Sequence, residues 1–193
     1  MIKSLCVYCG SRMGNKPTYA KLAKEMGEIM AKEDINLVYG GGSIGLMGII
    51  ADSVIDNGGK VFGFIPEHLD IVEVSYTRAT KMTVVPNMHV RKFSMFAEAD
   101  AFLVLPGGLG SLDEYFEIIT WAQLGLHNKP IILLNQDNYW QPLLNLLDHV
   151  VEEGFADAST YDLFAIVDDI HDVLPLCRKL HTNSPPKPLV IPK

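Results

Sequence analysis

The sequence predicts an α/β domain in which a mostly parallel central sheet is covered by helices on both faces. Short apolar runs alternate with longer segments of helical pattern along the chain. The runs are continuously apolar, which is typical of strands buried on both sides in a parallel sheet. Glycine clusters follow several of these runs directly. Together these features indicate a Rossmann-like three-layer domain.

The predicted elements alternate in order along the chain. Apolar runs predict strands at residues 4–9, 35–39, 60–65, 82–85, 101–105, 131–134 and 164–167. Helical periodicity predicts helices at residues 19–32, 46–56, 88–99, 112–124, 140–152 and 170–180. No repeat or linker divides this pattern, so residues 1–181 are predicted to form one nucleotide-binding catalytic domain. Residues 182–193 are predicted to be a proline-rich tail, either a loose extension or a subunit contact.

The composition excludes several classes of protein. A hydrophobic content of 48% and a charged content of 20% suit a globular chain of 193 residues and not a disordered one. The formal net charge is −7, without a run of lysine and arginine, so we expect no nucleic-acid partner. A single small phosphate remains a compatible ligand, because a few cations and backbone amides suffice to hold it.

The three cysteines are predicted to be buried, reduced thiols. Cys6 and Cys9 form a C-x-x-C pattern, which also occurs in metal and redox sites. However, residues an odd number apart point to opposite faces of a strand, so the two thiols are not expected to meet. Neither a secretory leader nor a membrane span is apparent. We therefore expect a soluble cytoplasmic protein with no membrane partner and no metal.

Three glycine-rich loops are predicted at the carboxyl edge of the sheet, where open parallel sheets bind ligands. They begin at Gly10, Gly40 and Gly107. The loop 40–45 matches the dinucleotide fingerprint G-x-G-x-x-G, but the acidic residue that would hold the ribose of NAD is missing at the expected distance. A structural turn or a nucleotide contact at Gly42 are the two remaining interpretations.

The loop 106–114 is the more specific motif. Gly107, Gly108 and Gly110 precede a predicted helix, whose free amides, with the Ser111 hydroxyl, would form an anion cradle. Glu114 has two interpretations. Ser111-x-x-Glu114 has the spacing of a helix capping box. Alternatively, a carboxylate beside a phosphate cradle would lie near a bound sugar, where it could stabilise an oxocarbenium-like centre or orient water.

The segment 88–96 places two adjacent cations, Arg91 and Lys92, on a helix that is apolar on most sides. Such a helix is expected to be largely buried. The cations either extend to the surface or clamp a phosphate or base. His89 is expected to be structural or to support a residue that contacts the ligand. Glu73, in the loop before the fourth strand, and Thr120, farther along the helix of Glu114, are within reach of the same edge.

These motifs resemble the LOG ("lonely guy") family of cytokinin riboside 5′-monophosphate phosphoribohydrolases, some of which carry a lysine decarboxylase label. The family pattern P-G-G-x-G-T-x-x-E corresponds to residues 106–114, with Ser111 in place of threonine. M-H-x-R-K corresponds to residues 88–92, G-G-G-x-x-G-L-M-G to 40–48, and I-T-W-A-Q-L-G to 119–125. Cys9-Gly10-Ser11, Gly14, Pro17 and Tyr19 match the N-terminal pattern. The resemblance covers residues 4–180.

The resemblance implies hydrolysis of the N-glycosidic bond of AMP or N6-prenylated AMP, which gives free base and ribose 5-phosphate. It implies that Arg91 and Glu114 are catalytic and that no cofactor is needed. It also implies a homo-oligomer, a dimer or larger. The lysines show no pattern of a pyridoxal phosphate site, so a decarboxylase is not expected. The substrate contacts that it implies are Glu73, Lys92, Gly107, Gly108, Leu109, Gly110, Ser111, Thr120, Ser11 and Gly42.

Two other functions stay open at this point. A non-catalytic nucleotide or cofactor carrier would share the anion cradle but would not need the Glu114 carboxylate. A nicotinamide-dependent dehydrogenase would bind NAD. Tyr115, Phe116 and Trp121 could line a prenyl pocket, although such a helical stripe is more often core.

Overall fold

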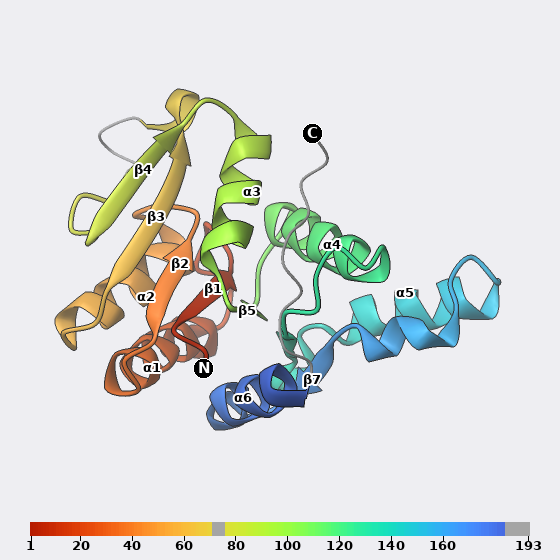
Figure 1. Ribbon diagram of the computed structural model, residues 1–193. Coiled ribbons are helices and arrows are strands. Elements are labelled where there is room, and N and C mark those ends of the chain that lie inside the picture. The colour runs from red at the N-terminus through yellow and green to blue at the C-terminus, as the bar shows by residue number, and fades with distance from the viewer. Residues whose placement is uncertain (71–75, 184–193) are drawn as a thin grey trace.

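The computed structural model describes residues 1–70 and 76–183. They form one seven-stranded, wholly parallel sheet with helices on both faces (Figure 1), so the predicted fold class is confirmed. The strands are β1 Ser4–Tyr8, β2 Asn36–Tyr39, β3 Val61–Pro66, β4 Lys81–Val85, β5 Ala101–Val104, β6 Ile131–Leu134 and β7 Ala165–Val167. The α-helices are α1 Pro17–Lys32, α2 Gly45–Asp56, α3 Met88–Glu98, α4 Leu109–Gln123, α5 Gln141–Glu152 and α6 Val173–Asn183.

The strand order is β4-β3-β2-β1-β5-β6-β7. The chain therefore builds one half of the sheet outward from β1 and then returns to add β5 on the other side of β1. In the pairing of β1 with β5, Leu5 lies opposite Ala101 and Tyr8 opposite Val104. In this register β1 and β5 end at the same level. These two neighbouring strands mark the point at which the strand order of the sheet changes direction.

The two faces of the sheet bury separate cores. Leu5 and Val7 of β1 belong to the core that packs under α1, α2 and α6. Cys6 and Tyr8, which alternate with them, belong to the core under α3, α4 and α5. Helices thus cover both faces, as the continuously apolar strands predict.

The cysteines are free and buried, as predicted. Cys6 and Cys9 lie in the two different cores, so the C-x-x-C pattern brings no pair of thiols together. Burial raises the pKa of both thiols, which keeps them protonated. Among residues 1–70 and 76–183, no helix is long and apolar enough to cross a membrane.

Helix boundaries differ from the prediction by two or three residues in α1, α4 and α6. Helix α1 begins at Pro17, two residues earlier than predicted, because proline fits the first turn, where its missing N–H is not needed. Helix α4 begins at Leu109, three residues earlier than predicted, with Gly108 as its N-cap residue. Farther along, residues 170–172 form a short 3-10 helix, and α6 itself continues to Asn183. The rest of the predicted tail, residues 184–193, lies outside the described residues.

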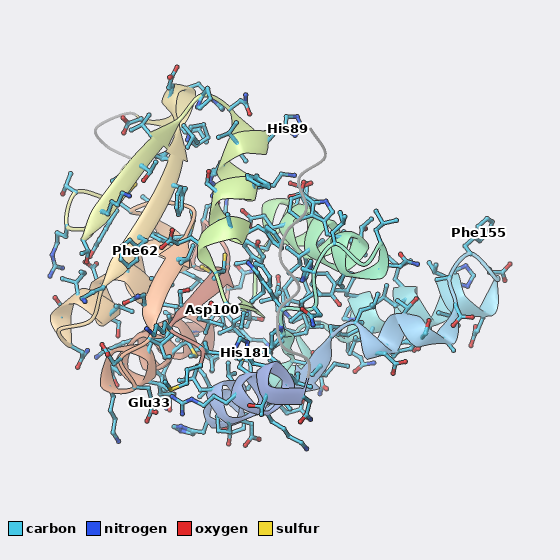
Figure 2. All side chains as sticks on the ribbon, in the orientation of Figure 1. Glu33, Phe62, His89, Asp100, Phe155 and His181 are labelled. Carbon is cyan, nitrogen blue, oxygen red and sulfur yellow. The ribbon has the colours of Figure 1, made fainter. Side chains whose placement is uncertain are left out.

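Helix α3 is less buried than the sequence predicts. Only Arg91, Met95 and Phe96 are buried, while Val90 and Phe93 remain partly exposed. The helix therefore covers the sheet with a narrow stripe, and one of the two adjacent cations lies within that stripe. Figure 2 shows His89 at the outer edge of the molecule, where it is exposed and takes no part in the core.

Candidate active site

A cleft of about 790 Å³ opens at the carboxyl ends of β1 and β5. After β1 the chain turns to α1 on one face of the sheet, and after β5 it turns to α4 on the other. The two loops therefore diverge and leave a crevice between them, as at the switch points of other open α/β sheets. The cleft is lined by residues 9–16, Tyr19, Leu46, Met47, Arg91, residues 106–111, Glu114 and Tyr139.

The glycine loops are tied together by backbone hydrogen bonds. The Gly10 N–H donates to the Pro106 carbonyl at 3.0 Å, and the Leu46 N–H donates to the Gly10 carbonyl at 3.0 Å. Gly45 adopts a left-handed φ of +63° against the backbone of Ser11, so a side chain there would collide with that loop. The prediction that three glycine loops gather at one edge of the sheet is confirmed.

Arg91 is fixed by acceptors from three different elements. Its Nε donates to the Phe64 carbonyl of β3 at 3.1 Å, and its Nη2 donates to the Gly40 carbonyl after β2 at 3.3 Å. Its Nη1 donates to Oε1 of Glu114 at 3.2 Å. A Cβ added at Gly40 would lie 1.7 Å from Nη2, so glycine is required there to admit the guanidinium. All three nitrogens are thus held before any ligand binds.

Glu114 is the carboxylate that lines the cleft, and its side chain is only 10% exposed. Burial raises the pKa of this carboxyl to about 7, against the opposing attraction of the Arg91 guanidinium. A carboxyl that titrates near neutral pH can exchange protons with a substrate or water under working conditions. Arg91 and Glu114 thus form a buried ion pair at the wall of the cleft, with a carboxyl whose pKa lies near neutral pH.

The capping-box interpretation of Ser111 and Glu114 is wrong. The N-cap of α4 is Gly108, and no side chain caps the helix. Both residues lie inside α4, where Glu114 accepts a hydrogen bond from Arg91. The reason is that Gly108 and Gly110 let the helix start before Ser111, which turns the Glu114 side chain toward α3.

The glycines of the predicted anion cradle lie at the start of α4 and line the cleft. A Cβ added at Gly108 or Gly110 would meet no atom within 4 Å, although both residues line the cleft. Internal packing therefore does not require these glycines, and the space that side chains would fill is left for a ligand. Gly107 differs, since a Cβ there would lie 2.1 Å from the buried Ser111 hydroxyl. The first amides of α4 have no partner within the helix and favour an anion.

Several predicted site residues lie in the cleft and others do not. The cleft contains Arg91, Glu114, Ser11, Gly107, Gly108, Leu109, Gly110 and Ser111. Lys92 does not line it, because its ammonium binds Asp113 and Glu117, each at 3.1 Å. Gly42 packs beside Met47, and Thr120 lies on the exposed face of α4. Glu73 lies outside the described residues.

The aromatic stripe on α4 is core at Tyr115 but not at Phe116. Tyr115 is fully buried, Trp121 packs edge-on against Phe96, and neither lines the cleft. Phe116 is 38% exposed and also lies away from the cleft. These side chains therefore do not form a prenyl pocket within this chain's cleft.

Several polar residues of the cleft were not predicted from the sequence, among them Arg12, Lys16 and Tyr139. Arg12 and Lys16, in the loop after β1, are exposed cations on its rim. Tyr139, after β6, lines the cleft and donates to the Gly107 carbonyl at 2.6 Å. The position of Arg12 directly after Gly10-Ser11 was a usable signal. Tyr139 gave none, because it belongs to a loop without a glycine cluster.

Within the described part of the chain, no group of three or more His, Cys, Asp and Glu side chains could hold a metal ion. The polar lining of the cleft instead consists of amides, hydroxyls, three cations and one carboxylate. This set of groups suits an organic phosphate.

Comparisons with known proteins show which family the chain is related to. The profile of a family described as "Possible lysine decarboxylase" matches residues 47–177. The chain is 47% identical to a protein of Oryza sativa subsp. japonica named "Probable cytokinin riboside 5′-monophosphate phosphoribohydrolase", over 90% of this chain and 75% of that protein. It is 42% identical to the "Cytokinin riboside 5′-monophosphate phosphoribohydrolase" of Rhodococcoides fascians, over 91% of this chain and 89% of that protein.

Solved structures share the fold at lower identity. The molybdenum cofactor binding protein of Rippkaea orientalis superposes with a TM-score of 0.71 at 20% identity, over 93% of this chain and 98% of the other. The Moco carrier protein of Chlamydomonas reinhardtii gives 0.68 at 17%, over 95% and 99%. At these identities the likeness concerns the fold alone. The extent and identity of the sequence matches decide the relationship: the chain belongs to the LOG family of cytokinin riboside 5′-monophosphate phosphoribohydrolases.

Proposed function

We propose that this chain hydrolyses the N-glycosidic bond of nucleoside 5′-monophosphates, AMP or N6-prenylated AMP, to free base and ribose 5-phosphate. The observation that carries the proposal is the buried pair of Arg91 and Glu114 beside a helix N-terminus in one cleft. The names of the relatives that match most of the chain support the same reaction.

The phosphate is assigned to the start of α4. There the amides of residues 108–111 and the positive end of a 15-residue helix favour an anion. Arg12 and Lys16 add positive charge on the opposite rim of the cleft. We also assign Ser11, on that rim, to substrate contact. The cleft is thus locally cationic in a chain of net charge −7, and it selects a small anion over a polyanion.

The position of Glu114 fits a ribose that is held by its 5′-phosphate. Glu114 lies five residues beyond Leu109, or about 7.5 Å along the axis of α4. A phosphate at the helix start would therefore place the sugar ring beside the carboxylate. As the C1′–N bond breaks, positive charge develops on the sugar, and the Glu114 carboxylate stabilises it.

The complete reaction adds water across the glycosidic bond. A water oxygen bonds to C1′, the electron pair of the C1′–N bond leaves with the base, and the base gains a proton. Glu114 orients the water, takes the proton that the water gives up and returns that proton to the departing base. Arg91 holds the carboxylate toward the sugar and, through its three fixed hydrogen bonds, prevents it from turning away.

The remaining predicted contacts are assigned by their surroundings. Lys92 supports α3 against α4 through Asp113 and Glu117 and does not touch the substrate. Gly42 supports the loop that carries Gly40 and lies outside the contact surface. Thr120, exposed on α4, would need a second subunit to reach a ligand. We keep Glu73 as a substrate contact.

We further propose a cytoplasmic homodimer with one catalytic domain. Leu109 of α4 and Leu124, directly after that helix, are 86% and 68% exposed, which is unusual for large apolar side chains and favours a subunit contact. Three free, buried cysteines suit a reducing compartment. The net charge of −7 supports the absence of a nucleic-acid partner. Light scattering of the purified protein tests the subunit number.

The proposal is tested by incubating the purified protein with AMP and with isopentenyladenosine 5′-monophosphate and following free base by chromatography. Release from either nucleotide, abolished by Glu114→Gln, is the expected result, and the two rates rank the substrates. Tight binding of both nucleotides without release would instead favour a carrier. The Glu114→Gln variant serves as the matched control because it keeps the size and polarity of the side chain.

A further inference from the structure

Tyr139 is a residue of the cleft to which the proposed reaction assigns no role. It follows the short 3-10 helix Gln136–Asn138 after β6 and lines the cleft together with the loop 106–111, which holds the predicted anion cradle. Its hydroxyl donates to the Gly107 carbonyl at 2.6 Å. Burial raises the pKa of Tyr139 above its ordinary value, so the hydroxyl stays protonated and remains a donor.

The surrounding structure fixes the position of this hydroxyl. Asp137 and Asn138 adopt left-handed φ angles of 57° and 56°, which form the sharp turn just before Tyr139. The buried Asn135 side chain accepts a hydrogen bond from the Trp140 N–H at 2.7 Å and closes that turn. The Tyr139 ring packs edge-on against Tyr19 at 5.3 Å and against Trp140 at 4.8 Å. A strained turn held in this way indicates that the orientation of the tyrosine matters.

The hydrogen bond from Tyr139 completes a series of three along the cradle. The Pro106 carbonyl accepts from the Gly10 N–H at 3.0 Å, and the Gly108 carbonyl accepts from the Leu112 N–H at 3.0 Å. Backbone groups thus hold the first and third carbonyls, and the Tyr139 side chain holds the middle one. That middle peptide joins two glycines, the residue type with the most freedom to rotate.

Fixing a carbonyl also fixes the amide on the other side of the same peptide. In a trans peptide the C=O and the following N–H point in opposite directions. The bond to the Gly107 carbonyl therefore sets the direction of the Gly108 N–H. It also sets the entry of the chain into α4, whose first amides form the anion cradle.

We infer that Tyr139 is a positioning residue that presets the Gly107–Gly108 peptide, so that the amides at the start of α4 face the ligand phosphate. The assignment of that ligand as a nucleoside 5′-monophosphate rests on the proposed function. Tyr139 acts on the phosphate only through the backbone and lowers the entropic loss of binding by organising the cradle in advance.

Tyr139→Phe isolates the hydroxyl, because phenylalanine keeps the ring contacts with Tyr19 and Trp140. Tyr161→Phe is a matched control, since the Tyr161 hydroxyl also makes one hydrogen bond, to Asp148, but lies away from the cleft. Amide hydrogen exchange of the unliganded proteins is measured first, on peptides that cover residues 106–112. We expect several-fold faster exchange there in Tyr139→Phe alone.

The second measurement is the Kd of ribose 5-phosphate by calorimetry. The Kd of AMP is measured in parallel with the same proteins carrying Glu114→Gln in addition, so that AMP is not hydrolysed during the titration. Tyr139→Phe should raise both Kd values roughly fivefold to tenfold, the typical effect of one hydrogen bond. With Glu114 intact, KM should rise while kcat stays within about twofold. Tyr161→Phe should change none of these values.

Unchanged exchange at residues 106–112 would overturn the inference even if the Kd values rise, because Tyr139 would then touch the ligand directly. Unchanged Kd values for ribose 5-phosphate and AMP would overturn it as well. The failure of the proposed function is distinguishable from both results. In that case the unmodified protein leaves AMP intact, while the exchange and Kd measurements still report on the cradle.

Discussion

Two neighbouring ion clusters join the same two helices, yet they differ in the exposure of their carboxylates and in the acceptors around their cations. Arg91 of α3 pairs with Glu114 of α4, and the next residue, Lys92, pairs with Asp113 and Glu117. Arg91 and Glu114 are 11% and 10% exposed and line the cleft. In the second cluster Lys92 is also 11% exposed, but its partners Glu117 and Asp113 are 23% and 58% exposed, and none of the three lines the cleft.

The difference shows that burial and acceptor geometry, rather than charge, separate a reactive pair from a supporting one. The Arg91 guanidinium is held by two backbone carbonyls in addition to Glu114, so its direction is fixed. The Lys92 ammonium is satisfied by carboxylates that remain in contact with water. Because its carboxylates stay partly solvated, the Lys92 cluster is expected to contribute little free energy, whereas breaking the buried Arg91–Glu114 pair leaves an uncompensated charge.

The sharpest test of this comparison is the paired substitution Glu114→Gln and Asp113→Asn. Each converts one carboxylate of α4 to an amide of the same shape. We expect Glu114→Gln to lower kcat roughly a thousandfold, because the charge that stabilises the transition state is lost. Asp113→Asn should stay within about threefold. Equal losses of kcat in the two variants would refute the distinction between the clusters.

Arg91→Lys is expected to have the next largest effect, a loss of roughly a hundredfold in kcat/KM. Lysine keeps the positive charge but cannot donate in three fixed directions to Phe64, Gly40 and Glu114. Steady-state kinetics with AMP measure the loss, and circular dichroism confirms the fold. Activity within threefold of the unmodified enzyme would show that charge alone suffices at this position.

The sheet was predictable from the sequence because its strands are apolar on both faces. Predicted and observed strand boundaries agree within one residue, as for 131–134 and β6. The start of α4 was not predictable from local pattern. Ser111 and Glu114 satisfy the spacing of a capping box, and only the tertiary contact with Arg91 shows that Glu114 is used elsewhere.

The site was predictable where a glycine motif marks it and not where it depends on distant segments. Arg91 and Glu114 stand in such motifs, but the partners that fix Arg91 come from β2, β3 and α4. Lys92 has the same local pattern as Arg91, and its different role follows from which side of α3 faces the sheet. Tyr139 reaches Gly107 across 32 residues, a contact that no local spacing signals.

A smaller effect is expected from pH. Burial raises the pKa of the Glu114 carboxyl to about 7, and the proposed reaction uses its charged form. The kcat/KM for AMP should therefore rise with pH through about 7 and be about tenfold lower at pH 6 than on the plateau. A profile that falls over the same range would instead assign Glu114 as a general acid that protonates the leaving base.

Folding stability provides an independent check of the same carboxyl. Its pKa is higher in the folded state than the ordinary 4.5, so the folded protein binds the extra proton between pH 4.5 and about 7. This contribution to stability is complete below pH 4.5 and is lost as pH rises through about 7. As pH rises over that range, the free energy of unfolding of the unmodified protein should therefore fall by up to roughly 3 kcal/mol relative to that of Glu114→Gln. Urea denaturation of both proteins at pH 5 and pH 8 measures the difference. A gap that does not depend on pH would contradict the raised pKa.

The smallest effect is expected from Lys92→Met, which removes the charge of the supporting cluster but keeps much of the side-chain length. Stability should fall by about 1 kcal/mol or less, and kcat/KM should stay within about threefold. Lys92 lowers the pKa of Glu114, so its removal should move the midpoint of the pH profile slightly upward. Lys92→Arg, which keeps the charge, should leave that midpoint in place. A loss of more than about thirtyfold in Lys92→Met would instead place the ammonium on the substrate, because a side chain that only joins two helices has no means to affect the reaction so strongly.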